Sequence, residues 1–363
     1  MHKIAIIGTN GLPGRYGGWD QLLNHLTSSL SEKYEIIVYT SKYNAVPGLE
    51  EFNNSKIRVL PLKANGIQSI FYDGYSMLES SLKYDILLVL GTSGCIFLPI
   101  IRLLNSNIIL NPDGAEWKRG KWNFIVKQFL KLSEYIGIKF AKVVVSDNLI
   151  IQNYVLNFYN KNSILIEYGG DQVLSKELTS ETQSRYEIFK GSYAFKVCRI
   201  EPENNIDLIL DVFAQVKLKL ILIGNWNNSS YGINTREKYR THSNLILLDP
   251  IYDQEKLDEF RSNCGLYIHG HSVGGTNPSL VEAMYLGLNC VVFDVDYNRV
   301  TTENKAIYFR DGAELLEIIA EFENESSVFN CVGKSLKSLA QIKYKWVDIV
   351  NKYDRIFNNI LGK

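Results

Sequence analysis

The chain has 363 residues, of which 46% are hydrophobic and 21% are charged, and its formal net charge is zero. This length exceeds the size at which a single hydrophobic core keeps growing, so we expect two domains. The balanced charge disfavours a dedicated nucleic-acid-binding protein, because such proteins carry a basic excess.

The N-terminus enters an apolar segment directly and lacks the charged region and cleavage site of a signal peptide. No apolar run approaches the roughly 18 residues that a membrane-spanning helix needs. The five cysteines are scattered without framework or metal-ligand spacing, and the neighbouring His269 and His271 have no cysteine beside them. We therefore expect a cytoplasmic protein that is neither secreted nor membrane-spanning, with no metal and no cofactor.

The first half of the chain alternates apolar runs with longer segments of helical periodicity, such as residues 19–30 and 120–140. Several of the runs are almost continuous Ile, Val and Leu, which is typical of strands covered on both faces in a parallel sheet. The predicted strands are KIAIIG from Lys3, EIIVYT from Glu35, KIRVLPL from Lys56, DILLVLG from Asp85, NIILNPDG from Asn107, KVVVSDN from Lys142 and SILIEYGG from Ser163. This pattern predicts a doubly wound α/β domain.

A polar stretch at residues 174–191 reads as a linker or surface helix, and the alternation then restarts. The second series of predicted strands is SYAFKVCRI, KLILIGNW, NLILLDPI, GLYIHGHS, NCVVFDVD and AIYFR. A second series indicates a second doubly wound domain. The stretch 341–361 is predicted to be one helix with Ile342, Trp346, Tyr353 and Phe357 on the same face. We expect domains at residues 1–170, joined by the C-terminal helix 341–363, and at 171–340.

A glycine-rich segment follows the first strand, with glycines at positions 8, 11, 14, 17 and 18. Such a loop lets backbone amides approach a ligand phosphate at a helix N-terminus. The dinucleotide spacing G-x-G-x-x-G is absent, and the second strand ends YTSK without an acid for a ribose hydroxyl, which disfavours NAD. A turn that serves chain reversal alone remains an alternative.

The segment HGHSVGGTNPSLVEAMYLG, residues 269–287, predicts a strand end, a glycine loop and a capped helix. Asn277 suits the N-cap, Pro278 the first helical position and Gly287 the C-terminal stop. The loop and the helix start expose N–H groups to an anion, with the helix dipole adding attraction. Glu282, one turn inside, can accept hydrogen bonds from ribose hydroxyls; the alternative is a capped helix with a solvated glutamate.

At this point the sequence resembles a known family. GGTNPSLVEAM is similar to the signature of family-4 retaining glycosyltransferases of the GT-B fold, especially bacterial rhamnosyltransferase-like members. The segments IIGTNGLPGRYGGWD, NPDGAEWKRGKW and CRIEPENN resemble the same subfamily in order and spacing. The resemblance spans nearly the whole chain and implies two Rossmann-like doubly wound domains that face across a cleft, with the C-terminal helix crossing back to the N-terminal domain.

The resemblance also implies roles for individual residues. The expected catalytic residues are Asp113 and Arg199, with Arg199 pairing with the diphosphate. The expected donor-binding residues are Gly17, Gly18, Arg199, Tyr252, Gly274, Gly275, Thr276, Asn277, Ser279 and Glu282. The expected acceptor-side residues are Tyr16, Asp113 and Trp117.

Two positions depart from the family pattern. The first of the two acids that the family spaces by seven residues falls at Gly274, and the lysine that usually follows the diphosphate arginine falls near Asn204. Asp294–Val295–Asp296 spells the D-x-D of metal-dependent glycosyltransferases, but GT-B enzymes usually need no metal. We interpret it as a polar strand end.

Residues 117–142 are basic, with Glu134 as the one acid between Trp117 and Lys142. A basic face with aromatic neighbours suits anionic lipid headgroups, and we predict a membrane surface at Lys118, Arg119, Lys121 and Lys127. The alternative is a crossover helix with a buried apolar face and a solvated lysine face.

The resemblance implies transfer of a sugar, L-rhamnose from dTDP-rhamnose, onto a lipid-linked saccharide in surface polysaccharide or capsule assembly. The expected partners are this nucleotide-sugar donor, the lipid-linked acceptor and an anionic membrane surface on the inner face, with no nucleic acid. Two alternatives stay open: a GT-B nucleotide-sugar 2-epimerase, and a non-catalytic nucleotide-binding subunit of a capsule-assembly complex.

Overall fold

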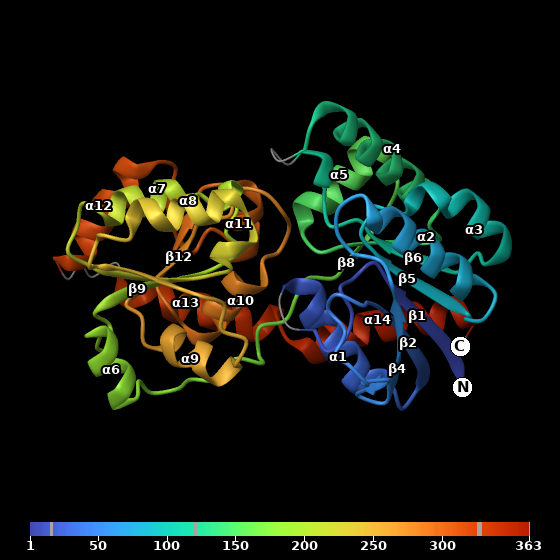
Figure 1. Cartoon of the computed structure of the whole chain (residues 1–363), viewed down its shortest axis with the longest axis horizontal. Helices are drawn as coiled ribbons and strands as arrows, with labels where there is room; N and C mark the ends of the chain where they lie inside the picture. The colour runs from blue at the N-terminus through green and yellow to red at the C-terminus, as the bar shows by residue number, and fades with distance from the viewer. Residues whose placement is uncertain (15–16, 119–121, 325–328, 363) are drawn as a thin grey trace. The chain divides into compact units, whose positions relative to one another are not determined.

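The computed structural model describes residues 1–14, 17–118, 122–324 and 329–362. The chain divides into two compact units (Figure 1). Unit 1 comprises Met1–Tyr168 together with Trp346–Lys363, and unit 2 comprises Gly169–Lys345. Each unit contains one mainly parallel β-sheet with helices on both faces.

The sheet of unit 1 has the strand order β3-β4-β2-β1-β5-β6-β7-β8, and every pairing except β3 with β4 is parallel. The order reverses between β1 and β5, which lie side by side. The strands are β1 (His2–Ile7), β2 (Tyr34–Ser41), β3 (Glu51–Phe52), β4 (Ser55–Leu60), β5 (Ile86–Leu90), β6 (Ile108–Asn111), β7 (Val143–Ser146) and β8 (Ile164–Leu165).

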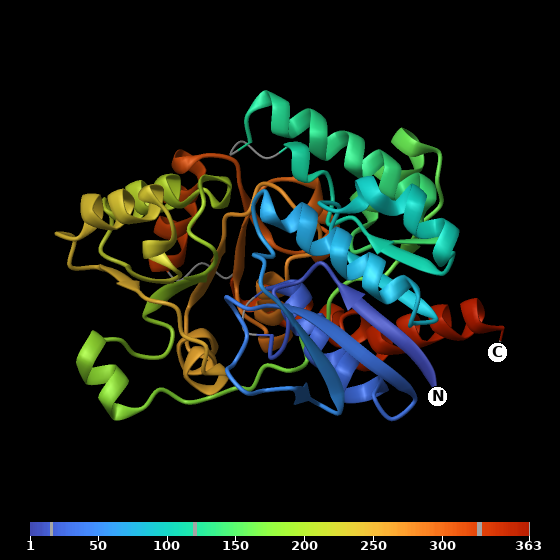
Figure 2. The ribbon, with the colours of Figure 1, turned by 45° about the vertical axis from the view of Figure 1, so that its right-hand side comes forward.

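Helices cover both faces of this sheet. Helices α1 and α14 lie on one face, and α2 to α5 lie on the other (Figures 1 and 2). The helices are α1 (Gly18–Leu30), α2 (Gln68–Ser81), α3 (Leu98–Leu104), α4 (Phe124–Phe140), α5 (Leu149–Tyr159) and α14 (Trp346–Leu361).

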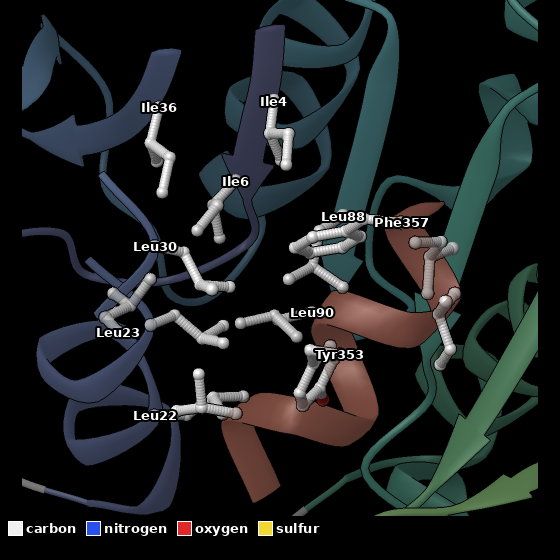
Figure 3. Close-up of a cluster of buried hydrophobic side chains, with 14 of the residues drawn as sticks. Ile4, Ile6, Leu22, Leu23, Leu30, Ile36, Leu88, Leu90, Tyr353 and Phe357 are labelled. Atoms are coloured by element: carbon white, nitrogen blue, oxygen red, sulfur yellow. The ribbon is translucent and has the colours of Figure 1, made fainter. Parts of the chain in front are cut away.

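The C-terminal helix α14 completes the core of unit 1. Figure 3 shows Tyr353 and Phe357 of α14 packed with leucines of α1 and with Ile4, Ile6 and Leu88 of the sheet. The hydroxyl of Tyr34 donates to Asp354 Oδ1 at 2.8 Å, and its ring meets Phe357 edge-on. Apolar burial therefore holds a helix that is distant in sequence onto the first domain.

The sheet of unit 2 has the order β11-β10-β9-β12-β13-β14 and is parallel throughout. Helices α7, α8 and α12 pack on one face, and α9, α10 and α13 on the other. The strands are β9 (Tyr193–Val197), β10 (Lys219–Ile223), β11 (Leu245–Leu248), β12 (Leu266–His269), β13 (Cys290–Phe293) and β14 (Ile307–Phe309). The helices are α6 (Ser180–Tyr186), α7 (Ile206–Phe213), α8 (Ser230–Tyr239), α9 (Gln254–Ser262), α10 (Pro278–Leu286), α11 (Asp296–Thr302), α12 (Gly312–Glu323) and α13 (Phe329–Lys343).

The predicted doubly wound α/β class is confirmed, and each strand predicted from an apolar run is present. Two local predictions were wrong or incomplete. The predicted continuous helix 341–361 is broken between α13 and α14, and Ile342 is 78% exposed rather than part of the apolar face. The short strand β3, which forms a hairpin with the predicted β4, was missed, although the two turn residues Asn53 and Asn54 both have the positive φ that asparagine tolerates in such turns.

Candidate active site

The carboxyl edge of the unit 2 sheet holds most of the predicted donor-binding residues. The strand order reverses between β9 and β12. Open α/β sheets bind ligands outside the carboxyl ends of the strands at such a reversal. Arg199 follows β9, and the glycine loop 270–277 follows β12. Two distant parts of the sequence therefore meet where open α/β sheets bind ligands.

The start of α10 supplies unpaired backbone donors. As predicted, Asn277 is the N-cap, with its Oδ1 accepting from Ser279 N at 3.1 Å and Ser279 Oγ at 2.8 Å, and Gly287 ends the helix in the left-handed conformation. The amides of Gly275 and Asn277 donate to no acceptor in the part of the chain that the structure describes. Thr276 between them is buried. Amides without acceptors at a helix N-terminus form an anion-binding site.

Gly274 adopts a backbone conformation that side chains disfavour. Its φ is +125°, and a Cβ built on it meets nothing within 4 Å. The open space agrees with the prediction that glycine leaves room here. The positive φ adds a reason the sequence did not reveal: any L residue at this position strains the loop.

Arg199 presents its guanidinium to solvent, with the side chain 53% exposed and its Nε 3.8 Å from Glu201 Oε2. Asn204 is buried and donates to the Arg199 carbonyl at 2.6 Å, while Asn205 donates to the Gly270 carbonyl at 2.8 Å. Asn204, where the family pattern has a lysine, is therefore a structural residue of the Arg199 loop.

Glu282 is buried within a charged network, so the alternative of a solvated glutamate is wrong. Its Oε2 lies 2.8 Å from Arg261 Nη2, and its Oε1 accepts from Gln172 Nε2 at 2.6 Å. Arg261 also reaches Asp258 Oδ1 at 3.2 Å, and Asp258 accepts from the backbone N of Leu174 at 2.9 Å. Burial raises the pKa of the Glu282 carboxyl, and the Arg261 guanidinium opposes that rise.

The sequence analysis missed Arg261, Gln172 and Lys196. Lys196 on β9 is buried, and its Nζ has no nitrogen or oxygen partner among the described residues. Its Nζ lies next to the first residue of the glycine loop 270–277, 3.2 Å from where a Cβ on Gly270 would sit. Burial lowers the pKa of this ammonium. The sequence signal that could have identified Lys196 is a lysine within a predicted strand of otherwise apolar residues.

The rings of His269 and His271 stack, with centroids 4.4 Å apart and nearly parallel planes. His269 is fully buried, and burial lowers its pKa well below the ordinary value, so the ring is neutral near pH 7. No group of three or more metal-ligating His, Cys, Asp or Glu side chains occurs among the described residues.

Unit 1 carries the remaining predicted site residues at the carboxyl edge of its own sheet. Gly17 is the N-cap of α1, with φ 106°, and Gly18 is the first residue of that helix. Asp113 follows β6 in the left-handed region, with φ 62°, and its N donates to Asn111 Oδ1 at 3.2 Å. Non-glycine residues with a left-handed backbone conformation are found more often at functional sites than elsewhere. Tyr16 lies outside the described residues.

Trp117 belongs to a cluster of aromatic and charged side chains in unit 1. Its Nε1 donates to Tyr154 Oη at 3.2 Å, and the buried Glu134 Oε1 accepts from Tyr154 at 2.6 Å and Tyr159 at 2.5 Å. The Lys118 ammonium lies over the Trp117 and Tyr154 rings, 5.5 and 4.9 Å from their centroids.

The predicted membrane surface lies only partly within the described residues. Lys118 is exposed and Lys127 is half-buried, and Arg119 and Lys121 lie outside the described residues. The alternative of a crossover helix with a buried apolar face holds in part: α4 buries Leu130 and Ile138, but its Ile125 and Leu132 are exposed. Tyr252 follows β11 in unit 2 and is exposed.

Comparison with known families agrees with this geometry. Residues 181–344 match the family model described as glycosyl transferases group 1, and residues 1–171 match that of a domain of unknown function (DUF1972). The chain carries a glycosyltransferase group 1 domain. The glycine loop 270–277, α10 and Arg199 all lie within this domain.

Solved structures with the same architecture are glycosyltransferases and related enzymes. Sucrose-phosphate synthase from Thermosynechococcus elongatus aligns with a TM-score of 0.84 at 14% identity over 100% of both chains. The Anabaena protein HepE in complex with UDP-glucose aligns at 0.78 and 12% identity, also over 100% of both chains. A putative UDP-N-acetylglucosamine 2-epimerase from Listeria monocytogenes aligns at 0.61 and 12% identity, over 99% of this chain and 96% of that one. These similarities establish the GT-B fold. No curated protein matches the chain.

The D-x-D sequence in the glycosyltransferase domain has a structural role. Asp294 follows β13, and Arg299 binds both of its oxygens, with Nε 2.5 Å from Oδ1 and Nη2 2.8 Å from Oδ2. This ion pair lowers the pKa of the Asp294 carboxyl. The interpretation of the motif as a polar strand end fits this pairing. Separately, the described helices include none that is long and apolar enough to span a bilayer.

Proposed function

We propose that the chain is a retaining glycosyltransferase of the rhamnosyltransferase-like subfamily of family 4. It would move L-rhamnose from dTDP-rhamnose onto a lipid-linked saccharide in surface polysaccharide or capsule assembly. The observation that carries the transferase proposal is the carboxyl edge of the unit 2 sheet. There, the amides of Gly275 and Asn277 have no acceptor among the described residues, and Arg199 presents an exposed guanidinium from the neighbouring loop.

These groups suit the chemistry of sugar transfer. Negative charge builds on the leaving diphosphate as the bond to the sugar breaks, and preorganised donors at that position lower the barrier. Arg199 offers a planar fork for phosphate oxygens, and the start of α10 adds backbone donors. Glu282, held by Arg261, would accept the ribose hydroxyls. Retention of configuration follows from the family resemblance.

The acceptor side stays a proposal based on the resemblance. Asp113 and Trp117 would contribute from unit 1, together with Tyr16, and Gly17 and Gly18 would approach the donor phosphates. The lipid-linked acceptor would lie at an anionic membrane, contacted by Lys118, Arg119, Lys121 and Lys127. The HepE structures contain UDP and UDP-glucose, which supports a nucleotide sugar as the donor class.

The donor preference tests the rhamnose proposal. Gly274 leaves open space where related enzymes have an acid, so a 6-deoxyhexose fits and dTDP-rhamnose should be turned over faster than UDP-glucose, UDP-galactose and UDP-N-acetylglucosamine. Gly274→Glu should lower rhamnose transfer further than Gly274→Ala. Both variants strain the loop, but only glutamate adds an unpaired carboxylate, at a cost of about 1–3 kcal/mol. The measurement is release of nucleoside diphosphate, with the anomeric configuration of the product read by NMR.

Gly274→Ala is the matched control, because it separates the backbone strain from the added charge. A preference for a gluco- or galacto-configured donor, or an inverted product, would contradict the rhamnose proposal and leave the GT-B fold untouched. Equal losses in Gly274→Glu and Gly274→Ala would show that backbone conformation, not sugar contact, explains the glycine.

Turnover should not depend on a divalent metal. Arg199 and the α10 amides would neutralise the diphosphate, and Asp294 is already paired with Arg299. We expect the rate of nucleoside diphosphate release to be unchanged by EDTA. Complete loss of turnover in EDTA, restored by Mg²⁺ or Mn²⁺, would contradict this expectation.

A further inference from the structure

Helix α2 exposes a row of apolar side chains, while its buried side combines serines with Tyr72 and Met77. Its buried side is rich in serines, each bonded to a carbonyl of the same helix or the turn before it. Ser76 Oγ donates to Tyr72 O at 2.7 Å, Ser80 Oγ to Ser76 O at 2.6 Å, and Ser69 Oγ to Gly66 O at 2.6 Å. The serine hydroxyls are satisfied within the helix, and these small side chains let it pack closely against the sheet.

The outward side of α2 is apolar. Exposed residues recur at spacings of three and four along the helix and its flanking turns, which aligns them on one face. They are Ile67, Phe71, Tyr75, Leu78 and Leu82. A surface helix in water places charged residues at such positions. The arrangement therefore indicates that the outward side of α2 meets a partner other than water.

The apolar surface continues onto the next two helices. Helices α2, α3 and α4 are successive neighbours on one face of the unit 1 sheet (Figures 1 and 2). Leu103 of α3 is 85% exposed and Ile125 of α4 is 78% exposed. We call this surface the α2–α4 face, formed by Ile67, Phe71, Tyr75, Leu78, Leu82, Ile100, Leu103, Leu104, Phe124, Ile125, Leu132 and Tyr135.

The charges around the α2–α4 face are positive. The carboxylates of these three helices are buried or paired: Asp73 and Glu134 are buried, and Glu79 forms ion pairs with Arg58 and Lys83. In the described part of α2, α3 and α4 no carboxylate is exposed. The basic residues on or next to these helices are Lys83, Arg102, Lys127, Lys131, Lys139 and Lys142.

We propose that the α2–α4 face docks onto the surface of an anionic lipid bilayer. Exposed aliphatic and aromatic side chains would enter the headgroup region, the tyrosine hydroxyls would stay near water, and the lysines would contact anionic headgroups. A second copy of the chain fits less well, because a symmetric contact would bring two basic surfaces together. The inference deepens the membrane contact proposed above, by assigning the docking surface to an apolar face and not to lysines alone.

Sedimentation with vesicles tests the docking surface. The variant Phe71→Gln/Leu103→Gln/Ile125→Gln removes one large apolar residue from each helix, and exposed substitutions of this kind leave folding nearly unchanged. We expect the parent to bind phosphatidylcholine vesicles that contain phosphatidylglycerol, and to bind more weakly without it. The triple variant should lose at least about tenfold in apparent affinity.

The matched control is Phe189→Gln/Ile233→Gln/Ile342→Gln, three exposed apolar residues of unit 2 that should bind vesicles like the parent. The inference is overturned if the parent does not bind anionic vesicles, if the triple variant binds as tightly, or if the control loses as much. It is also overturned if only Lys118→Gln/Lys127→Gln releases the protein, or if the triple variant abolishes a dimer instead. Nucleotide binding, measured separately by calorimetry, reports on the proposed transfer function and should be the same in all variants of the face.

Discussion

Replacing Arg261 with methionine is expected to lower the free energy of unfolding by about 3–5 kcal/mol. The guanidinium is buried between Glu282 and Asp258, at 2.8 and 3.2 Å, and its removal leaves two buried carboxylates without a counter-charge. Methionine fills much of the same volume, so the loss reports the charge and not a cavity. Denaturant unfolding followed by circular dichroism measures the change.

The matched control is Arg240→Met, which removes an exposed arginine of the same unit. Its ion pair with Glu237 is at 2.9 Å, but the side chain is 67% exposed, so the expected loss is below about 1 kcal/mol. Equal unfolding midpoints for the two variants would show that the buried network adds no stability.

The loss of unfolding free energy caused by Arg261→Met should become smaller as the pH falls. Burial raises the pKa of Glu282 in the folded protein, and losing Arg261 raises it further. The folded variant then takes up a proton at higher pH than the unfolded chain does, and that uptake stabilises it below the folded-state pKa. The stabilisation is lost as the pH rises through that pKa. Unfolding at about pH 5 and about pH 8 compares the two regimes.

Arg199→Ala is expected to weaken binding of nucleoside diphosphate by about 1.5–3 kcal/mol, which is roughly 10- to 150-fold. Its guanidinium is exposed, and its loop is hydrogen-bonded to the loop before α10, from Ser272 N to Glu203 O at 3.0 Å. A diphosphate bound at these loops would gain charge-assisted hydrogen bonds from Arg199. Glu282→Gln should also weaken binding, because an amide is a poorer acceptor for ribose hydroxyls. Titration calorimetry with UDP and dTDP measures both effects.

Arg240→Ala is the control for this experiment, since Arg240 follows α8 and precedes the start of β11, at the amino edge of the sheet. It should bind nucleotide as the parent does. If Arg199→Ala and Glu282→Gln both bind as tightly as Arg240→Ala, the candidate active site is in the wrong place.

The fold was predictable from the sequence because its signals are local. Near-continuous Ile, Val and Leu runs mark buried parallel strands, and the succession Asn277, Pro278 and Gly287 marks the ends of α10. The break between α13 and α14 was not predictable in this way. Tyr344 is buried there, with its N bonded to Ala340 O, and the apolar pattern continues across the break.

The candidate site was predictable only in part. Glycines and a capping asparagine have local signatures, which is why Gly274 and Asn277 were found from the sequence, whereas Arg199 came only from the family resemblance. The partners of Glu282 were missed because Gln172 is 110 positions away in the sequence, and only the tertiary fold brings it to 2.6 Å.

Helix α2 carries apolar residues on both its buried and its exposed side, so periodicity does not identify the core face. An argument from periodicity assumes that the apolar stripe of a helix faces the core. In α2, Tyr72 and Met77 are buried, but Phe71 and Leu78 are exposed and Ser76 and Ser80 are fully buried.

The most direct test of the central claim is acceptor-dependent sugar transfer. Labelled dTDP-rhamnose is incubated with the parent protein, with and without a membrane lipid extract, and the label is followed into the lipid fraction while nucleoside diphosphate is measured. A glycosyltransferase with its donor site at the start of α10 predicts transfer only with the extract, and strongly reduced transfer in Arg199→Ala. Conversion of the donor sugar without an acceptor would identify an epimerase, and nucleotide binding without any turnover would identify a non-catalytic subunit; either result would contradict the account.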